Sequence, residues 1–281
     1  MNRIVYVNGE FVAEADAKIS VFDRGFLFAD GVYEVCSVID SRLVDNAAHL
    51  ERLRRSLREL RLEFVLDDAN IEAIQKELVA RNALREGALY LQVSRGAADR
   101  DFAFPKSPAP SLVMFTQARR LVDNPAAAKG MAVISLPDIR WRRRDIKTVQ
   151  LLYPSMAKQA ALDAGADDAW LVEDGLVTEG TSNNAWIVKG GKIITRQLSN
   201  DILHGITRAA ILRLAAEDRI VFEERPFTIA EAQAADEAFV TSATTFVMPV
   251  VRIDGKLVGN GNPGAVSGRL RALYIEEARR A

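Results

Sequence analysis

The sequence predicts an α+β protein built of two domains that each contain helices and strands. Its 281 residues are more than one small core needs, so one large or two medium domains are expected. Apolar residues make up 49% of the chain and charged residues 27%, a balance typical of a packed globular protein. Strand-like segments outnumber helix-like ones, but both kinds occur in each half, which favours a mixed class over a doubly wound sheet.

The first half opens with a hairpin and continues with two helices. Asn8-Gly9 tolerates the positive φ angles of a tight turn and separates two short apolar runs. Leucines spaced by three or four residues predict an amphipathic helix over 47–62. Asp67 and Asp68 are natural N-cap residues for a second helix over 68–84. The expected strands of this half follow at 89–93 and 112–116.

The segment 118–129 shows no sustained periodicity, so it is expected to be an interdomain linker. It divides the chain into an N-terminal domain over 1–119 and a C-terminal domain over 120–281, which carries Lys147. The expected elements of the second domain are a strand at 131–136, a helix at 155–164, hairpins about Asp174-Gly175 and Gly190-Gly191, a helix at 207–217, a hairpin about Asp254-Gly255 and a final helix at 265–280.

Composition and missing motifs exclude several classes of function. A formal net charge of −1 gives no overall field that attracts nucleic acid or membrane, so a small ligand is expected. The single cysteine, Cys36, is expected to be a buried thiol in a reducing compartment. Because no signal peptide or membrane-spanning stretch is apparent, a cytoplasmic protein is expected. One cysteine and two histidines are too few for a zinc site, so no metal is expected. The glycine-rich nucleotide motifs and the G-x-S-x-G elbow are also missing.

Lys147 and Glu179 point to a particular cofactor. In isolation, a lysine that follows the arginines of 140–144 would be an ordinary solvated lysine. Burial and neighbouring guanidinium groups favour the neutral amine, which attacks an aldehyde to form a Schiff base. Glu179 alone would be a surface carboxylate, but pyridoxal chemistry needs an anion against the pyridine nitrogen. The pair therefore indicates pyridoxal 5'-phosphate.

Other segments supply groups that bind a phosphate. Gly205-Ile206-Thr207 opens a helix, where free N–H groups and the helix dipole favour an anion. Arg52 offers a planar pair of donors, and hydroxyl groups gather at 241–245. The same residues also have plain structural interpretations: a helix cap, one more cation on an arginine-rich helix, and the end of a strand. Likewise, Thr181, Ser182, Asn183 and Asn184 either form a turn or offer hydroxyl and amide groups to the ring oxygen, phosphate or carboxylate.

The ordered motifs of the chain resemble the fold-type IV pyridoxal phosphate enzymes, the branched-chain aminotransferase-like superfamily, and among them the D-amino acid aminotransferases. The resemblance runs almost end to end. The matching stretches are Asp23-Arg24-Gly25-Phe26, Asp30-Gly31-Val32-Tyr33-Glu34-Val35, His49-Leu50-Glu51-Arg52-Leu53, Asp138-Ile139-Arg140-Trp141, Asp145-Ile146-Lys147, Thr178-Glu179-Gly180, Gly205-Ile206-Thr207-Arg208 and Pro249-Val250. The resemblance implies two mixed α/β domains with the active site at the domain interface, and a homodimer.

The resemblance also implies a role for each matching residue. Lys147 would hold the cofactor, Glu179 would pair with the pyridine nitrogen, and Leu203 would pack beneath the ring. Glu34 would be a structural acid, and the loop containing Arg100 would reach into the neighbouring subunit's site. The expected cofactor-binding residues are Arg52, Lys147, Glu179, Thr181, Ser182, Asn183, Leu203, Gly205, Ile206, Thr207, Ser242, Ala243 and Thr244, and the expected substrate-binding residues are Tyr33, Arg100, Phe102 and Arg24.

Two positions depart from the pattern. D-amino acid aminotransferases of the well-known bacterial type carry Arg-x-His in the loop, whereas this chain has Arg100-Asp101-Phe102. A phenylalanine donates no hydrogen bond, so either Arg100 binds the carboxylate alone or Arg24 compensates. Relatives commonly place a phosphate-binding threonine where this chain has Ala243. Ser242, Thr244 or main-chain N–H groups must then take that role.

The sequence therefore predicts a transaminase that moves the amino group of a D-amino acid, such as D-alanine or D-glutamate, to a 2-oxo acid. An L-branched-chain aminotransferase typically has glycine after the Phe/Tyr-Glu pair, whereas Val35 follows Glu34 here. An (R)-amine transaminase accepts amines without a carboxylate, which Arg100 disfavours. A 4-amino-4-deoxychorismate lyase would release pyruvate without an amino acceptor. A binding protein with chance motifs would be colourless and unmodified by borohydride at Lys147.

Overall fold

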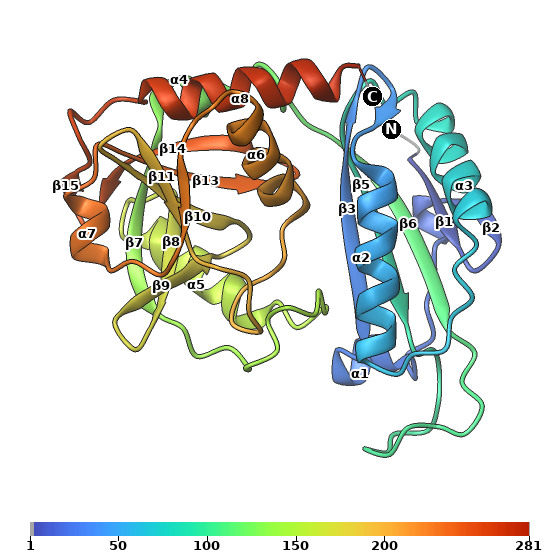
Figure 1. The fold of residues 1–281 in the computed structure, drawn as a ribbon. Helices are drawn as coiled ribbons and strands as arrows, with labels where there is room; N and C mark the ends of the chain where they lie inside the picture. The colour runs from blue at the N-terminus through green and yellow to red at the C-terminus, as the bar shows by residue number, and fades with distance from the viewer. Residues whose placement is uncertain (1–2, 281) are drawn as a thin grey trace. The chain divides into compact units, whose positions relative to one another are not determined.

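The computed structural model describes residues 3–280 and divides into two compact units (Figure 1). The described part of the first unit comprises residues 3–120 and 146–150, and the second unit comprises Leu121–Asp145 and Leu151–Arg280. Each unit contains a sheet and helices, so the predicted α+β class is confirmed.

The first unit is a six-stranded antiparallel sheet with strand order β2-β1-β6-β5-β3-β4. Two helices, α2 and α3, pack against it through a continuous apolar core that includes Leu53, Leu78 and Met114. The strands are β1 (Ile4–Val7), β2 (Glu10–Ala13), β3 (Gly31–Ile39), β4 (Arg42–Leu43), β5 (Glu86–Ser94) and β6 (Ser111–Ala118). The helices are the short 3₁₀ turn η1 (Glu14–Asp16), α1 (Arg24–Phe28), α2 (Asn46–Glu59) and α3 (Asp68–Arg81).

The local signals of this unit act as the sequence predicts. Asn8 and Gly9 both have positive φ angles and turn the β1–β2 hairpin, in which Val5 pairs with Val12. The Asp67 side chain accepts hydrogen bonds from the backbone N–H groups of Ala69 and Asn70, so it is the N-cap of α3. Cys36 is buried, and burial raises the pKa of its thiol well above the ordinary value.

The second unit is a nine-stranded mixed sheet in which eight strands follow the order β12-β11-β10-β13-β14-β7-β8-β9, and β15 pairs with β14. The pairs β11–β12, β14–β7 and β7–β8 are parallel, and the remaining pairs are antiparallel. The strands are β7 (Met131–Pro137), β8 (Asp168–Glu173), β9 (Leu176–Gly180), β10 (Asn184–Lys189), β11 (Lys192–Thr195), β12 (Phe222–Glu224), β13 (Glu237–Ser242), β14 (Phe246–Ile253) and β15 (Lys256–Leu257). The helices are α4 (Pro125–Lys129), α5 (Leu152–Asp163), α6 (Ile206–Glu217), α7 (Ile229–Gln233) and α8 (Ala265–Ala278).

The segment 118–129 is not wholly irregular, because residues Pro125–Lys129 form α4. The Asn124 side chain accepts a hydrogen bond from the N–H of Ala126, and proline occupies the first turn. Both features favour a helix start. A helix of five residues is too short to show an apolar periodicity, which is why the pattern failed to predict it.

The segment Ile146–Gln150 lies beyond residue 120 in the sequence but packs with the first unit. The N–H of Tyr33 donates to the carbonyl of Lys147 at 3.0 Å, and the N–H of Val149 donates to the carbonyl of Gly31 at 3.1 Å. Ile146 is buried in the core of that unit. Lys147 is therefore fixed against the start of β3.

Candidate active site

Lys147 extends its side chain over the aromatic ring of Tyr33. Its Nζ lies 4.2 Å from the ring centroid, and its backbone N–H lies 3.4 Å from the Ser56 hydroxyl group on α2. Tyr33 in turn stacks on Tyr90, with ring centroids 5.4 Å apart. The amine is therefore half-buried beside an aromatic face, where contact with bulk water is reduced and its position is defined.

Glu34, next to Tyr33 on β3, forms a buried ion pair with Arg52. Arg52 Nε and Nη2 donate to the two carboxylate oxygens at 2.8 and 2.7 Å, and His49 Nδ1 lies 2.7 Å from one of them. Burial alone would raise the pKa of Glu34 and is the largest single influence, but Arg52 and His49 together outweigh it and lower the pKa to about 2. Glu34 thus holds the guanidinium of Arg52 in one orientation, as a phosphate ligand requires.

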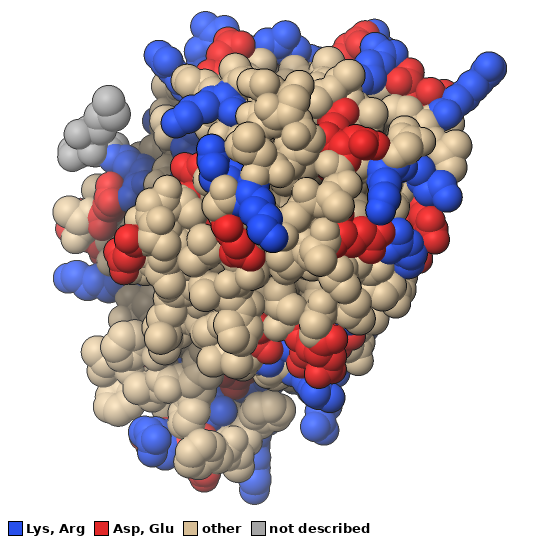
Figure 2. Space-filling view, turned by 90° about the vertical axis from the view of Figure 1, so that its left-hand side faces the viewer, with Lys and Arg blue, Asp and Glu red and all other residues tan. Residues whose placement is uncertain are grey.

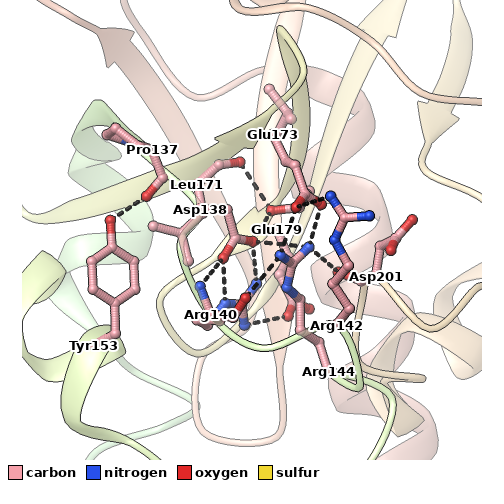
Figure 3. A network of polar contacts seen from close by, with 12 residues as sticks. Pro137, Asp138, Arg140, Arg142, Arg144, Tyr153, Leu171, Glu173, Glu179 and Asp201 are labelled. Atoms are coloured by element: carbon pink, nitrogen blue, oxygen red, sulfur yellow. Dashed lines mark hydrogen bonds and ion pairs between the residues drawn. The ribbon is translucent and has the colours of Figure 1, made fainter.

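Glu179, at the end of β9, has donors on both carboxylate oxygens, and Figure 3 shows it beside Arg140. Arg140 Nη1 donates to Oε1 at 2.7 Å, while the Asn184 side chain and the backbone N–H of Leu203 donate to Oε2 at 3.2 and 3.0 Å. Three donors hold the carboxylate in one orientation. The arrangement is suited to an anion that faces a protonated nitrogen.

Arg140 reaches Glu179 because Asp138 holds its other edge. Arg140 Nε and Nη2 donate to the Asp138 carboxylate at 2.9 and 2.7 Å, and the Thr178 hydroxyl donates to it at 2.7 Å. Burial is the largest influence on the pKa of Asp138 and would raise it, but the bonds from Arg140 and Thr178 with the attraction of Arg144 lower it. Burial likewise opposes the charged Arg140, yet Glu179 and Asp138 outweigh it and raise its pKa.

The other arginines that precede Lys147 are also ion-paired. Arg144 donates to Glu173 at 2.8 Å, Arg142 lies 3.7 Å from the same carboxylate, and Arg143 pairs with Asp145 at 3.0 Å. The basic run that the sequence analysis noted therefore forms a network of balanced charges, which Figure 3 shows in part.

Asn184 joins Glu179 to the N-terminus of α6. Its side-chain N–H group donates to the carbonyl of Leu203 at 3.0 Å as well as to Glu179. A Cβ atom at Gly205 would meet Asn184 Oδ1 at 2.1 Å, so only glycine fits at this helix cap. Among residues 3–280, no side chain caps the first turn of α6, so its N–H groups are oriented as an anion site requires. Thr207 is buried within that turn.

The hydroxyl cluster at 241–245 lies at the turn between β13 and β14. Thr241 pairs with Asn184 of the neighbouring strand β10, so this turn begins beside the Glu179 and α6 groups. The Thr241 hydroxyl accepts from Trp186, and the Ser242 and Thr245 hydroxyls lie 2.8 Å apart. Within residues 3–280, the Thr244 hydroxyl has no hydrogen-bond partner. Thr244 is therefore the side chain of the turn that is available to a ligand.

Thr181 and Asn183 direct their polar groups to Asp168. The Thr181 hydroxyl donates to one carboxylate oxygen at 2.6 Å, and the Asn183 amide donates to the other at 2.8 Å. Ser182 is exposed between them. The geometry thus gives Thr181 and Asn183 a turn-forming function, and their side chains would have to exchange these bonds to contact a ligand.

Arg24 holds the loop that carries Arg100. Its guanidinium is buried, donates to Asp30 at 2.8 Å and to the carbonyl of Asp101 at 2.6 Å, and lies 4.4 Å from the Phe28 ring centroid. A contact from Arg24 to a substrate would break these bonds. The Arg100 guanidinium lies 5.7 Å from the Phe102 ring centroid, and the Phe102 side chain is 79% exposed.

Arg140 and Asp138 were not among the predicted site residues, and the contact of Asn184 with Glu179 was not predicted either. Arg140 and Asp138 belong to a stretch that carried the family resemblance without a role, and Asn184 ends the polar run after Glu179. The sequence places Arg140 two positions after Asp138. Nothing in that spacing predicts that Nη1 of Arg140 also bonds to Glu179, 39 positions away. Only the pairing of strands brings these residues together.

The charged side chains on the surface are mixed in sign (Figure 2). On the face shown in Figure 2, basic and acidic side chains are interspersed, and neither sign forms a continuous field. In residues 3–280, no helix is long and apolar enough to span a membrane. The same residues contain no group of three His, Cys, Asp or Glu side chains that could hold a metal ion.

The chain is similar to known proteins over nearly its whole length. The amino-transferase class IV family matches residues 31–253. A D-alanine aminotransferase of Bacillus licheniformis is 38% identical over 263 residues, which cover 94% of this chain and 93% of that protein. A D-alanine aminotransferase of Staphylococcus aureus is 36% identical over 278 residues, covering 97% and 98%. A T.th. branched-chain amino acid aminotransferase complexed with N-(5'-phosphopyridoxyl)-L-glutamate has a TM-score of 0.90 at 26% identity, covering 99% of this chain and 94% of that one.

The chain therefore belongs to the amino-transferase class IV family, the fold-type IV pyridoxal phosphate enzymes. The predicted family, fold and cofactor are confirmed. The two relatives are D-alanine aminotransferases, whereas the similar solved structure is an aminotransferase for branched-chain amino acids.

Proposed function

We propose that this protein is a pyridoxal phosphate-dependent transaminase that transfers the amino group of a D-amino acid, such as D-alanine or D-glutamate, to a 2-oxo acid. The observation that carries the proposal is the 36–38% identity to D-alanine aminotransferases over nearly the whole chain. We further propose that the enzyme acts as a homodimer. We also propose that the enzyme acts in the cytoplasm. The free, buried thiol of Cys36 is compatible with that reducing compartment.

The residues of each unit fit a phosphorylated pyridine. In the first unit, Lys147 offers a half-buried amine and Arg52 a guanidinium fixed by Glu34. In the second, Glu179 offers a carboxylate, and α6 offers an N-terminus closed by Gly205, whose missing Cβ leaves room for Asn184. An amine, an anion for a ring nitrogen and donors for a phosphate are the groups that pyridoxal phosphate requires.

In this proposal Lys147 is the attachment point and the acid–base group. Its amine would hold the cofactor through the aldehyde group, and the free amine would take the proton from the substrate α-carbon. When bound, the cofactor would supply the electron-withdrawing group that accepts the electron pair left at that carbon. Glu179 would keep the pyridine nitrogen protonated, and the bonds from Arg140 and Asn184 keep its carboxylate in place.

The remaining residues bind and orient. Arg52, Ile206 and Thr207 are assigned to the phosphate, with Leu203 beneath the ring. The backbone of Leu203 is hydrogen-bonded to both Glu179 and Asn184. These bonds fix the position of Leu203 relative to the Glu179 carboxylate. Tyr33 and Arg100 are assigned to the substrate carboxylate. Arg24 is assigned to hold the loop that carries Arg100.

The test is a parallel assay of amino donors. Purified protein with pyridoxal phosphate and 2-oxoglutarate is offered D-alanine, D-glutamate, L-alanine, L-leucine and an (R)-amine, and oxo-product formation is followed. Turnover of the D-amino acids is expected. Exclusive turnover of the L-substrates would indicate an L-aminotransferase, and turnover of amines without a carboxylate would indicate an amine transaminase.

A second test concerns the amine. Lys147→Ala should abolish transamination and remove the borohydride-stable label from the protein, whereas Lys192→Ala on a surface hairpin should leave both unchanged. Retained activity in Lys147→Ala would remove the basis for the mechanism.

A further inference from the structure

The turn between β13 and β14 has a strained backbone. Ser242 pairs with Phe246, so the turn itself is the three-residue loop 243–245. Phe246 ends it with a φ of 57°. This left-handed position closes three-residue hairpin loops and is normally given to glycine. A bulky residue there is an outlier, and such outliers persist only where the surroundings enforce them.

The phenylalanine ring is one of the groups that enforce the conformation. Phe246 is completely buried, and its ring centroid lies 5.2 Å from that of Tyr274 on α8, which is 2% exposed. Helix α8 lies along β14 in Figure 1. The side chain is therefore an anchor that draws the end of the turn toward this helix.

Arg271, one turn before Tyr274 on α8, holds the backbone on both sides of the strained residue. Its Nη1 donates to the carbonyls of Thr245 and Val247 at 2.7 and 3.0 Å. Its Nη2 donates to the carbonyls of Leu121 and Val122 at 2.6 and 3.0 Å. One guanidinium thus ties the turn to the start of the second unit.

The charge of Arg271 has no carboxylate in contact. Within residues 3–280, no Asp or Glu lies within ion-pair distance of its nitrogens, and Asp123 acts on it only through a longer-range attraction. Burial lowers the pKa of the guanidinium, as expected where a charge is removed from water. By contrast, Arg140 and Arg144 are ion-paired. A positive charge therefore remains beside a turn that also presents the Thr244 hydroxyl.

We propose that Arg271 is a positioning residue for the cofactor phosphate. It fixes the 243–245 turn in the conformation that presents the Thr244 hydroxyl and the turn backbone to the phosphate, and it adds positive charge beside this turn. This inference rests on the proposed function. It explains how the chain binds a phosphate with Ala243 at the position where relatives commonly place a threonine. Arg271 and Tyr274 of α8 fix the turn. A hydroxyl side chain at position 243 is therefore not required to bind the phosphate.

The experiment compares two ligands that differ only in the phosphate. Dissociation constants for pyridoxal phosphate and for pyridoxal are measured by absorbance on the wild type, Arg271→Met, Arg271→Lys and Arg269→Met. Arg269 lies on the same helix and pairs with Asp218 at the surface, so it is the matched control. Arg271→Met should bind pyridoxal phosphate about tenfold more weakly, the effect of one lost charge-assisted contact, with pyridoxal unchanged. Arg271→Lys should show a smaller loss of the same kind, because one ammonium cannot reach four carbonyls.

Several results would overturn the inference. Equal losses for both ligands would make Arg271 a general structural residue, and unchanged affinity for both would remove any role. Thermal unfolding monitors the fold, and if Arg271→Met does not fold, the ratio of the two affinities in Arg271→Lys decides. A wild type that binds neither ligand through Lys147 would instead refute the proposed function itself.

Discussion

At the residue scale, the orientation of the Glu179 carboxylate is fixed by the donors around it. Arg140 occupies one oxygen, and Asn184 and the Leu203 backbone occupy the other. Arg140 is itself fixed by two bonds to Asp138. In the proposed function Glu179 faces a protonated ring nitrogen, and this network fixes the direction of its carboxylate.

Removal of the Arg140 guanidinium should therefore impair catalysis more than cofactor binding. Arg140→Met is expected to lower kcat about tenfold, the effect of one lost charge-assisted bond on a group that acts in the reaction. The absorbance maximum of the bound cofactor should shift as well. Arg142→Met is the control, because the Arg142 side chain is 81% exposed and lies 3.7 Å from Glu173. An unchanged kcat and spectrum in Arg140→Met would mean that Asn184 and Leu203 suffice.

Glu34 should make folding stability depend on pH in acid. Its folded-state pKa of about 2 lies below the ordinary 4.5, so its stabilising effect is complete above pH 4.5 and is lost as the pH falls toward 2. The contribution at stake is roughly 3 kcal/mol. Glu34→Gln leaves the buried Arg52 without its partner and should be less stable near neutral pH.

Denaturant unfolding of wild type and Glu34→Gln at several pH values tests this expectation. The difference in unfolding free energy between them should shrink between pH 4.5 and pH 2, because only the wild type loses the ion pair there. A difference that stays constant over this range would show that Glu34 does not titrate with the lowered pKa.

Sequence alone suggested Lys147, Glu179 and Arg52 as candidates. A Schiff base needs an amine, the ring nitrogen needs an anion, and the phosphate needs a cation. It could not supply the partners of these groups. The Glu34–Arg52 bonds join residues 18 positions apart on a strand and a helix, and the Arg140–Glu179 bond spans 39 positions. Such contacts depend on strand order, which no local pattern encodes.

At the element scale, the N-terminus of α6 depends on glycine at position 205. A Cβ at Gly205 would approach Asn184 Oδ1 to 2.1 Å, so Gly205→Ala must displace either the helix start or Asn184. We expect cofactor affinity to fall by at least about tenfold, because both the phosphate donors and the Glu179 partner would move. Titration with pyridoxal phosphate measures the loss, and an unchanged affinity would contradict this account of the helix cap.

A glycine in α8 should behave in the opposite way. Gly268 lies within the helix, is exposed, and a Cβ there would meet nothing within 4 Å. Gly268→Ala should raise stability by about 1 kcal/mol and the Tm by about 2–4 °C, because alanine loses less backbone entropy in a helix. A lower Tm would show that α8 is constrained at this position by something other than helix propensity.

Elements with strong local signals were predictable and those set by pairing were not. The turn at Asn8-Gly9 and the Asp67 cap each act within a few residues, so the sequence revealed them. Helix α4 depends on the Asn124 cap and the proline that follows it, and it is too short to show a periodicity. The parallel pairing of β14 with β7 joins distant segments, so the order of the mixed sheet could not be inferred.

At the scale of the whole molecule, the loop that carries Arg100 is held by its own chain. Arg24 bonds to the carbonyl of Asp101, and Arg95 bonds to Asp30 and lies 3.7 Å from the Phe104 ring centroid. Phe102 takes the place of the histidine that the family resemblance predicts in this loop, so in the proposed function Arg100 is the group assigned to the substrate carboxylate. If the enzyme is a homodimer as proposed, Arg100 would serve the partner subunit's site.

Mixing one inactive and one weakly binding variant tests whether Arg100 acts across a dimer. Arg100→Ala should raise the KM for D-alanine, and Lys147→Ala should have no activity. When the two variants are unfolded together and refolded, a mixed dimer would contain one site with both Lys147 and the partner-supplied Arg100. At low D-alanine, activity should then approach about a quarter of the wild-type value, since half of randomly paired dimers are mixed and each has one intact site. Activity no higher than the sum of the separate variants would place Arg100 in the site of its own chain, or away from the substrate altogether.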